Sequence, residues 1–340
     1  MKNFVPVWIL FILSLFLSSC QSANEKKGTS EQNSTATPSE LGSLNEKILS
    51  DSLNPEHYYL RSLYYLGQKD INKALGDINK AIQLDEKNSD YFVALSEIYL
   101  SMGRVPNCLE ALKKAEELDP VNNKALLKLA EVYLILKDYK NTFEYTRRAL
   151  DLDRINPVAH FYRAYAYMEM GDSSLAIQNF QAAIDQDQNY YDAYLELGAL
   201  YSAQKNPLAA GYLQTATRIE PGRGEAYYLL GMAYQEQENI PKAKETYEKL
   251  LTVSQDFKEA YYNLGFINLV YLNDFEEAVR FFTRAISLDP KYTDAYFNRG
   301  YSYELMGEYE SARKDYQKAL ELVPNYERSI LGLNRLDSIQ

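Results

Sequence analysis

The sequence predicts an all-α protein, a solenoid of about eight helix-turn-helix units with a capping helix at each end. Three observations predict this fold. Segments of similar pattern recur at intervals of 33 to 35 residues, the eighth position of every segment is small, and the eleventh is tyrosine in seven segments of eight. The chain has 340 residues, 46% hydrophobic and 24% charged, a composition typical of globular proteins.

Charge and residue counts exclude several classes of function. The 36 Lys and Arg are outnumbered by 47 Asp and Glu, so the chain lacks the cationic surplus that neutralises nucleic-acid phosphates. Two cysteines and two histidines are too few for a zinc cluster or a disulfide framework. We therefore expect no nucleic-acid partner, no metal and no cofactor.

The first 19 residues read as a signal peptide. Lys2 gives a positive start, and residues 7–17 (VWILFILSLFL) are an apolar run too short to cross a bilayer as a helix. Two serines precede Cys20. We expect residues 1–19 to be cleaved.

Residues 17–20, Leu-Ser-Ser-Cys, resemble the lipobox of bacterial lipoprotein signals. This resemblance implies that Cys20 is lipidated and becomes the first residue of the mature protein. Acyl chains such as palmitate would then anchor it to a membrane. Gln21 stands where enterobacterial lipoproteins retained at the inner membrane have Asp, which favours the outer membrane. Plain secretion and an uncleaved anchor remain as alternatives.

Residues 20–43 follow as a polar stretch with no aromatic residue, which predicts a flexible tether beginning at the lipidated cysteine. Ser43 and Glu46 are then spaced like a capping box, with apolar residues following at helical spacing. We expect a short capping helix within residues 44–54.

The repeat array spans residues 55–325. Its eight units are 55–88, 89–122, 123–156, 157–190, 191–223, 224–257, 258–292 and 293–326. The eighth position holds Ser62, Ser96, Ala130, Ala164, Gly198, Gly231, Gly265 and Gly300. Small side chains at this point, with alanine recurring later in each unit, let two antiparallel helices pack closely, and the tyrosine of the eleventh position fills the groove between units.

This alternation of small residues, tyrosine, alanine and a closing proline resembles the tetratricopeptide repeat over residues 55–324. The resemblance implies a right-handed α-solenoid. Unit five lacks one residue near 205–207 and unit seven has one extra near 272–274, and we expect the turns between helices to absorb both changes. Residues 326–338 read as a C-terminal capping helix.

The resemblance also implies that partners bind in a concave groove lined by the first helix of each unit. Large side chains at the groove positions are concentrated in unit four and units six to eight, which predicts an exposed aromatic patch. Asparagine at the sixth position suits hydrogen bonds to a peptide backbone. The expected partner-binding residues are Phe161, Tyr165, Tyr228, Met232, Tyr262, Asn263, Phe266, Phe297, Asn298 and Tyr301. The alternative is that these residues follow the family consensus and serve packing alone.

No catalytic pattern stands out. Asp185, Asp187, Asn189 and Glu196 have the spacing of a calcium loop, but Tyr190 occupies the position where that turn needs glycine. The chain has no HExxH, GxSxG, GxGxxG or P-loop motif. We therefore expect a protein that is not an enzyme.

The sequence as a whole favours an extracytoplasmic, lipid-anchored scaffold or adaptor whose groove binds an envelope protein or an extended peptide. Two alternatives stay open. The groove tyrosines could stack on sugar rings of a carbohydrate or another small ligand, or the groove could be filled permanently within an envelope complex.

Overall fold

The structure, a computed structural model, describes residues 40–339. Within this range the chain is all-α, with eighteen α-helices, one short π-helix and no strand. The described residues form two compact parts, the N-terminal part, 40–154, and the C-terminal part, 155–339. The predicted signal peptide, Cys20 and most of the predicted tether lie outside the described residues.

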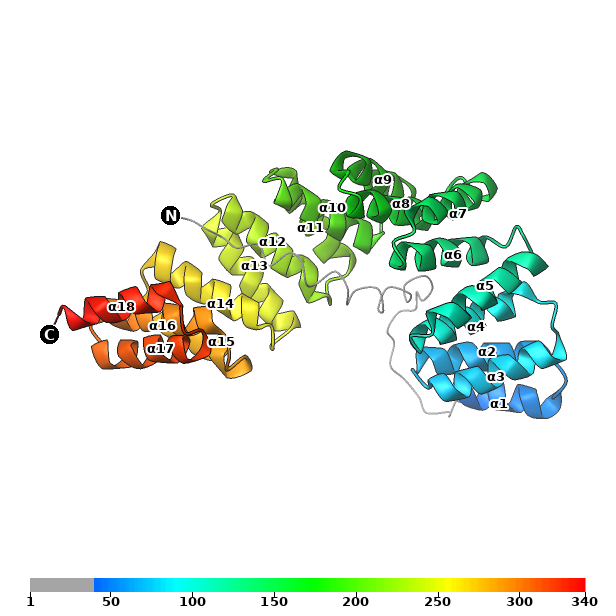
Figure 1. Ribbon diagram of the computed structural model, residues 1–340, viewed down its shortest axis with the longest axis horizontal. Coiled ribbons are helices and arrows are strands. Elements are labelled where there is room, and N and C mark those ends of the chain that lie inside the picture. The colour runs from blue at the N-terminus through cyan, green and yellow to red at the C-terminus, as the bar shows by residue number, and fades with distance from the viewer. Residues whose placement is uncertain (1–39, 340) are drawn as a thin grey trace, which may run out of the picture. The chain divides into compact units, whose positions relative to one another are not determined.

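The N-terminal part contains one single helix and three helix pairs. Within it each helix packs against the next one along the chain (Figure 1). The helices are α1 (Glu40–Ser50), α2 (Pro55–Gly67), α3 (Ile71–Leu84), α4 (Ser89–Ser101), α5 (Val105–Leu118), α6 (Asn123–Ile135) and α7 (Tyr139–Leu152).

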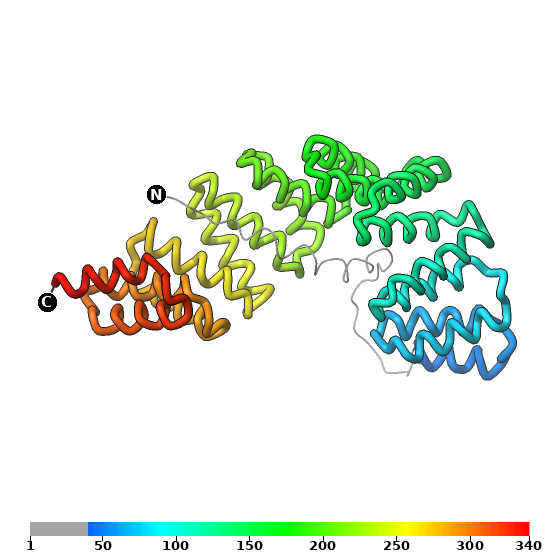
Figure 2. Tube along the Cα trace, viewed as in Figure 1, coloured from blue at the N-terminus to red at the C-terminus, as the bar shows by residue number. Residues whose placement is uncertain are grey.

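The C-terminal part contains five helix pairs and a final single helix. Figure 2 shows the same succession of antiparallel pairs along the Cα trace. The helices are α8 (Pro157–Glu169), α9 (Ser173–Gln186), α10 (Tyr191–Ala203), α11 (Leu208–Ile219), α12 (Gly224–Glu236), α13 (Ile240–Val253), α14 (Lys258–Ile267), α15 (Phe275–Leu288), α16 (Thr293–Leu305), α17 (Tyr309–Leu322) and α18 (Glu327–Asp337). The first helix of every pair, in both parts, begins at the residue where the sequence pattern begins a unit.

The small residues at the eighth position work as expected in holding paired helices together. At Gly231 on α12, an added Cβ would lie 2.4 Å from a ring carbon of Tyr247 on α13. Tyr247 is completely buried, and its hydroxyl donates to Oε1 of Gln235 at 3.2 Å. The glycine therefore makes room for a core tyrosine in the partner helix.

Both length changes in the repeats alter helices as well as turns, which corrects the expectation that the turns absorb them. The missing residue of unit five shortens α11 to 12 residues, where the other second helices of the pairs have 14. The extra residue of unit seven is taken up by a π-helix, Asn268–Leu272, followed by Asn273 in the left-handed conformation. A π-helical turn holds more residues than an α-helical one, so the insertion lengthens the end of the first helix of unit seven before the turn.

The N-terminal capping helix begins earlier than the sequence suggested. α1 covers Glu40–Ser50, so residues 40–43 are helical and belong to neither tether nor loop, whereas residues 51–54 are not helical. Leu44 is buried, and Asn45 accepts a hydrogen bond from Arg61 of α2 at 2.7 Å. These contacts with α2 hold the helix in place.

At the other end α18 covers the last pair. Its Arg335 forms a bidentate ion pair with Glu304 of α16, at 2.7 and 2.8 Å, and its Leu336 is 2% exposed. Gly332 lies directly against the ring of Tyr316 on α17. None of the helices described here is both long and apolar enough to cross a membrane.

Candidate functional site

The predicted binding residues all lie on first helices of the C-terminal part. We define the first-helix face by the side chains at the second, fifth, sixth and ninth positions of α8, α10, α12, α14 and α16. Of the ten predicted residues, Phe161, Tyr165, Asn263 and Asn298 are buried, and Tyr228, Met232, Tyr262, Phe266, Phe297 and Tyr301 are partly buried. None is fully exposed, and six of them keep part of their surface open to solvent.

The fifth-position rings are covered by the rings that end their own repeats. Tyr228 packs against Phe257, with ring centroids 5.1 Å apart, and Tyr262 stacks on Tyr292 at 5.0 Å. Phe161 and Phe297 make the same kind of contact with Tyr190, at 5.0 Å, and with Tyr326, at 5.8 Å. The result is a ladder of ring pairs, which consists of Phe161–Tyr190, Tyr228–Phe257, Tyr262–Tyr292 and Phe297–Tyr326. Each pair contains at least one partly buried ring, and that ring keeps an edge open to solvent.

The covering rings come from a column that the sequence reasoning did not use. The residue just before each first helix is Asn54, Asn88, Asn122 and Asn156 for α2, α4, α6 and α8, and each of these side chains caps its helix by accepting a backbone N–H. Before α10, α12, α14, α16 and α18 it is Tyr190, Arg223, Phe257, Tyr292 and Tyr326, with no side-chain cap. This change from asparagine to mostly aromatic residues is visible in the sequence, and it could have predicted that rings cover the fifth-position side chains.

The two predicted asparagines are engaged inside the protein. Asn298 Nδ2 donates to the hydroxyl of Tyr262 at 2.9 Å. Asn263 is buried, and its side chain lies near Tyr228, where it opposes the rise in the pKa of that tyrosine. Both amides therefore order the tyrosines of the face, which is a different role from the peptide-backbone contact expected of them.

Tyr228 and Tyr262 of this face remain neutral phenols at physiological pH. Burial, helped by the charge of Glu259, raises the pKa of Tyr228 to about 12. Burial raises the pKa of Tyr262 as well, and Asp294 adds to the effect. Each hydroxyl can thus both donate and accept hydrogen bonds, while its ring offers a π face.

Glu196, at the sixth position of α10, is the one carboxylate of the face that lies in the middle of a helix. It is partly buried, and the hydroxyl of Tyr165 on α8 donates to its Oε1 at 2.5 Å. No lysine or arginine among residues 40–339 forms an ion pair with it. Burial raises its pKa to about 7; the bond from Tyr165 lowers it, and the charges of Asp192 and Glu225 raise it further.

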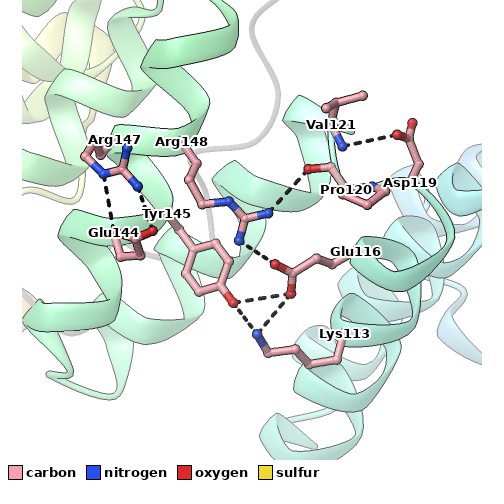
Figure 3. Close-up of polar contacts among 9 residues, drawn as sticks. All are labelled: Lys113, Glu116, Asp119, Pro120, Val121, Glu144, Tyr145, Arg147 and Arg148. Carbon is pink, nitrogen blue, oxygen red and sulfur yellow. Dashed lines mark hydrogen bonds and ion pairs between the residues drawn. The ribbon is translucent and has the colours of Figure 1, made fainter.

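Glu116 in the N-terminal part shows what a fully compensated glutamate looks like (Figure 3). It also accepts from a tyrosine hydroxyl, that of Tyr145, at 3.3 Å, but Arg148 and Lys113 pair with it at 2.5 and 3.0 Å. Burial opposes ionisation of Glu116, yet the hydrogen bonds from Arg148 and Lys113 outweigh it, so its pKa lies below its usual value. Glu196 likewise accepts a hydrogen bond from a tyrosine hydroxyl, but no lysine or arginine of the described residues pairs with it.

The remaining candidates for chemistry lie in separate helices and in the turns between them. Cys108 on α5 is 1% exposed, and burial raises the pKa of its thiol to about 11, which leaves it protonated. Asp185 lies in α9 and Glu196 in α10, so the residues with calcium-loop spacing are divided between two helices. Within residues 40–339 no group of three metal-ligating side chains gathers.

Family profiles identify the repeats. Profiles described as tetratricopeptide repeat match residues 55–88, 93–157, 163–223, 224–257 and 293–326, and one described as TPR repeat matches 268–307. The solved structure of the C-terminal part of a TPR repeat-containing protein from Cytophaga hutchinsonii is similar, with a TM-score of 0.60 at 22% identity. It covers 71% of this chain and 99% of its own, and at this identity the likeness shows the fold.

Similar segments occur in larger proteins of other kinds. The chain is 32% identical over 124 residues to protein O-mannosyl-transferase TMTC1 of Mus musculus, a match covering 36% of this chain and 13% of that protein. It is 24% identical over 140 residues to the mitochondrial import receptor subunit TOM70 of Rattus norvegicus, covering 41% of this chain and 22% of that protein. The chain therefore spans less than a quarter of the length of these relatives, and the similarity lies in a minor share of each.

Proposed function

We propose that this tetratricopeptide-repeat protein is a membrane-anchored, non-catalytic scaffold that binds a partner protein or an extended peptide through the first-helix face of its C-terminal part. Repeats of this family in general bind peptides or proteins. The observation that carries the proposal is the ladder of ring pairs on that face, because aromatic side chains held in place by packing offer contact area at little entropic cost.

The solvent-facing edge of the ladder is the part available to a partner. Met232, Phe266 and Tyr301, all at the ninth position, are partly buried and pack against the core from its rim. Tyr262 and Phe297 pack more deeply, each against two or more rings. A variant that tests binding should therefore alter the ninth position and leave the ring pairs intact.

Affinity capture from crosslinked cell envelopes tests the scaffold. The variant Met232→Ala/Phe266→Ala removes contact area from the face, and Leu208→Ala/Tyr309→Ala removes exposed apolar side chains elsewhere as a matched control. We expect a discrete protein to be retained by the wild type and the control and lost from the variant, with all three helical by circular dichroism. Equal retention by all three would contradict binding at this face, and capture of soluble glycans alone would favour the carbohydrate receptor.

The anchor is proposed from the lipobox-like residues 17–20 and is tested separately. Cells labelled with an alkyne analogue of palmitate should yield labelled protein in the outer-membrane fraction. Cys20→Ala should abolish both the label and the membrane association, whereas Cys108→Ala, which removes the buried thiol, should leave both unchanged. Label on the Cys20→Ala protein would disprove the anchor and leave the scaffold proposal standing.

A further inference from the structure

Negative charge is concentrated in the C-terminal part of the chain. Residues 155–340 contain 26 Asp and Glu against 17 Lys and Arg, a formal charge of −9, whereas residues 1–154 contain 21 against 19. The face that we propose as the binding surface therefore belongs to the acidic part of the protein. Such a field favours the approach of a cationic partner.

Most carboxylates of the first-helix face have an explanation within the fold. Asp192, Glu225, Glu259 and Asp294 are each the second residue of a first helix, where a negative charge stabilises the helix N-terminus. Arg223 pairs with Asp192 and Glu225 at 3.1 and 2.8 Å, and Lys258 lies 3.9 Å from Glu259. These four residues do not by themselves require a ligand.

Glu196 has no such explanation. It lies in the interior of α10, away from the helix N-terminus, and its described partner is the neutral hydroxyl of Tyr165. Asp192 and Glu225 add negative charge near it and so oppose its ionisation. Glu116 in the N-terminal part, with a tyrosine and two cations around it, shows that the same chain compensates a partly buried glutamate where no ligand is needed.

The surroundings of Glu196 suit the side chain of lysine or arginine. At the starts of the first helices in the same part, the chain's own cations already lie over aromatic rings: Arg223 is 4.0 Å from the ring centroid of Tyr191, and Lys258 is 5.5 Å from that of Tyr292. Rings, phenol oxygens and a carboxylate without a cation all attract positive charge.

From these observations we infer that the partner segment bound by the first-helix face is basic, and that one of its lysine or arginine side chains pairs with Glu196. The inference rests on the proposed function, because it names the chemistry of the partner at the same face. Pairing supplies the cation that Glu196 lacks in the chain itself.

Three fluorescein-labelled 12-residue peptides test the charge preference by fluorescence anisotropy with the full chain in uncharged detergent at pH 8. They consist of Lys-Ser-Tyr, Gln-Ser-Tyr or Glu-Ser-Tyr repeated four times. We expect the Lys peptide to bind at least tenfold more tightly than the Gln peptide at 50 mM NaCl, with the advantage shrinking at 300 mM because salt screens the charges. The Glu peptide should bind most weakly.

Glu196→Gln tests the residue, since glutamine keeps an oxygen that can accept from Tyr165 and removes only the charge. It should weaken the Lys peptide about tenfold, leave the Gln peptide unchanged, and raise the unfolding midpoint of the free protein at pH 8 by about 3–6 °C. Glu248→Gln, the same change at an exposed position of α13, should alter none of these. Weaker binding together with higher stability distinguishes a ligand contact from a structural one.

Three peptide results would each overturn the inference. They are equal binding of the Lys and Gln peptides, no binding of the Lys peptide, and a Lys-peptide affinity that Glu196→Gln leaves unchanged. The proposed function fails separately, when the envelope capture described above retains no partner. A captured partner whose crosslinks to α10 and α12 map to a neutral or acidic segment would contradict the inference alone.

Discussion

At the scale of single residues, close packing of a helix pair can depend on a glycine at the eighth position of its unit. Gly231 admits Tyr247 so closely that a Cβ would lie 2.4 Å from the ring, whereas Gly76 on α3 has nothing within 4 Å of where its Cβ would be. Tyr247 is fully buried and cannot move aside without disturbing the core. A Cβ would therefore clash at Gly231 and would fit without contact at Gly76.

We therefore expect Gly231→Ala to lower the free energy of unfolding by about 1–3 kcal/mol, because the added methyl group overpacks the helix pair. Gly76→Ala should raise it by about 0.5–1 kcal/mol, because alanine loses less conformational entropy in a helix. Urea unfolding followed by circular dichroism measures both. A neutral Gly231→Ala would show that the pair can separate slightly at no cost.

Glu116 and Glu196 should respond oppositely to neutralisation and to pH. The pKa of Glu196 is raised in the folded state, so its contribution to stability is lost as pH rises through about 7. The pKa of Glu116 is lowered, so its contribution is present at neutral pH and is lost as pH falls below the usual carboxyl range. The groups facing Glu196 are Tyr165 from α8, Asp192 from its own helix and Glu225 from α12.

At pH 8 we expect Glu196→Gln to stabilise the protein by roughly 1–3 kcal/mol, an advantage that shrinks at pH 5. Glu116→Gln should destabilise it by about 2 kcal/mol at pH 7, and by less at pH 4, because two charge-assisted hydrogen bonds are weakened. Thermal unfolding of both variants across this pH range provides the measurement. Destabilisation by Glu196→Gln at pH 8 would mean that its charge is compensated in solution.

At the scale of elements, the turn inside each helix pair is made in the left-handed conformation by different residues in different units. Gly103, Gly171 and Gly307 adopt it at little cost, but Lys69, Lys137, Lys205, Glu238 and Asn273 also have positive φ. A side chain with a Cβ is strained there by roughly 1–2 kcal/mol. The repeat therefore imposes the turn even where the local sequence disfavours it.

Exchanging residues between two such turns should change stability in opposite directions. Lys69→Gly, at φ 60°, should raise the free energy of unfolding by about 0.5–1 kcal/mol, and Gly103→Lys, at φ 70°, should lower it by about 1 kcal/mol. Both turns lie in the N-terminal part, so the comparison uses the same helix-pair environment. Chemical denaturation of the two variants is sufficient, and a shift in the same direction for both would argue against strain in the turn.

At the scale of the molecule, each helix pair contacts mainly its neighbours in the chain within its own part, so within each part stability is passed from repeat to repeat. The ends depend on α1 and α18, which cover the terminal pairs. α18 contributes Leu336 to the core and Arg335 to the ion pair with Glu304. Removing it would expose the faces of α16 and α17 that it covers.

A chain ending at Tyr326 should unfold at a temperature lower by about 5 °C or more. Hydrogen exchange should show the loss of protection first in α16 and α17, with α2 to α5 unaffected, because contacts run between neighbouring pairs. Leu331→Ser, at a position of α18 that is 52% exposed, is the control and should leave the temperature nearly unchanged. Uniform loss of protection along the chain would contradict repeat-by-repeat stability.

The sequence by itself determined the helix pairs and their order. The first helices begin at Pro55, Ser89 and the corresponding residues of later units, because apolar and small residues recur at fixed positions and each unit is built from contacts local in the chain. It missed the earlier start of α1 at Glu40 and the π-helix Asn268–Leu272, because the ends of helices depend on what neighbouring helices cover.

The tertiary structure alone decided what the predicted binding residues do. Tyr262 is covered by Tyr292, the last residue of its own unit, and its hydroxyl accepts a hydrogen bond from Asn298 of the next unit. The difference between Glu196 and Glu116 likewise depends on which cations from other helices come within reach. Burial and charge compensation are set by contacts between helices. The repeat pattern of the sequence does not show these contacts, because the free energy of a side chain depends on its neighbours in space.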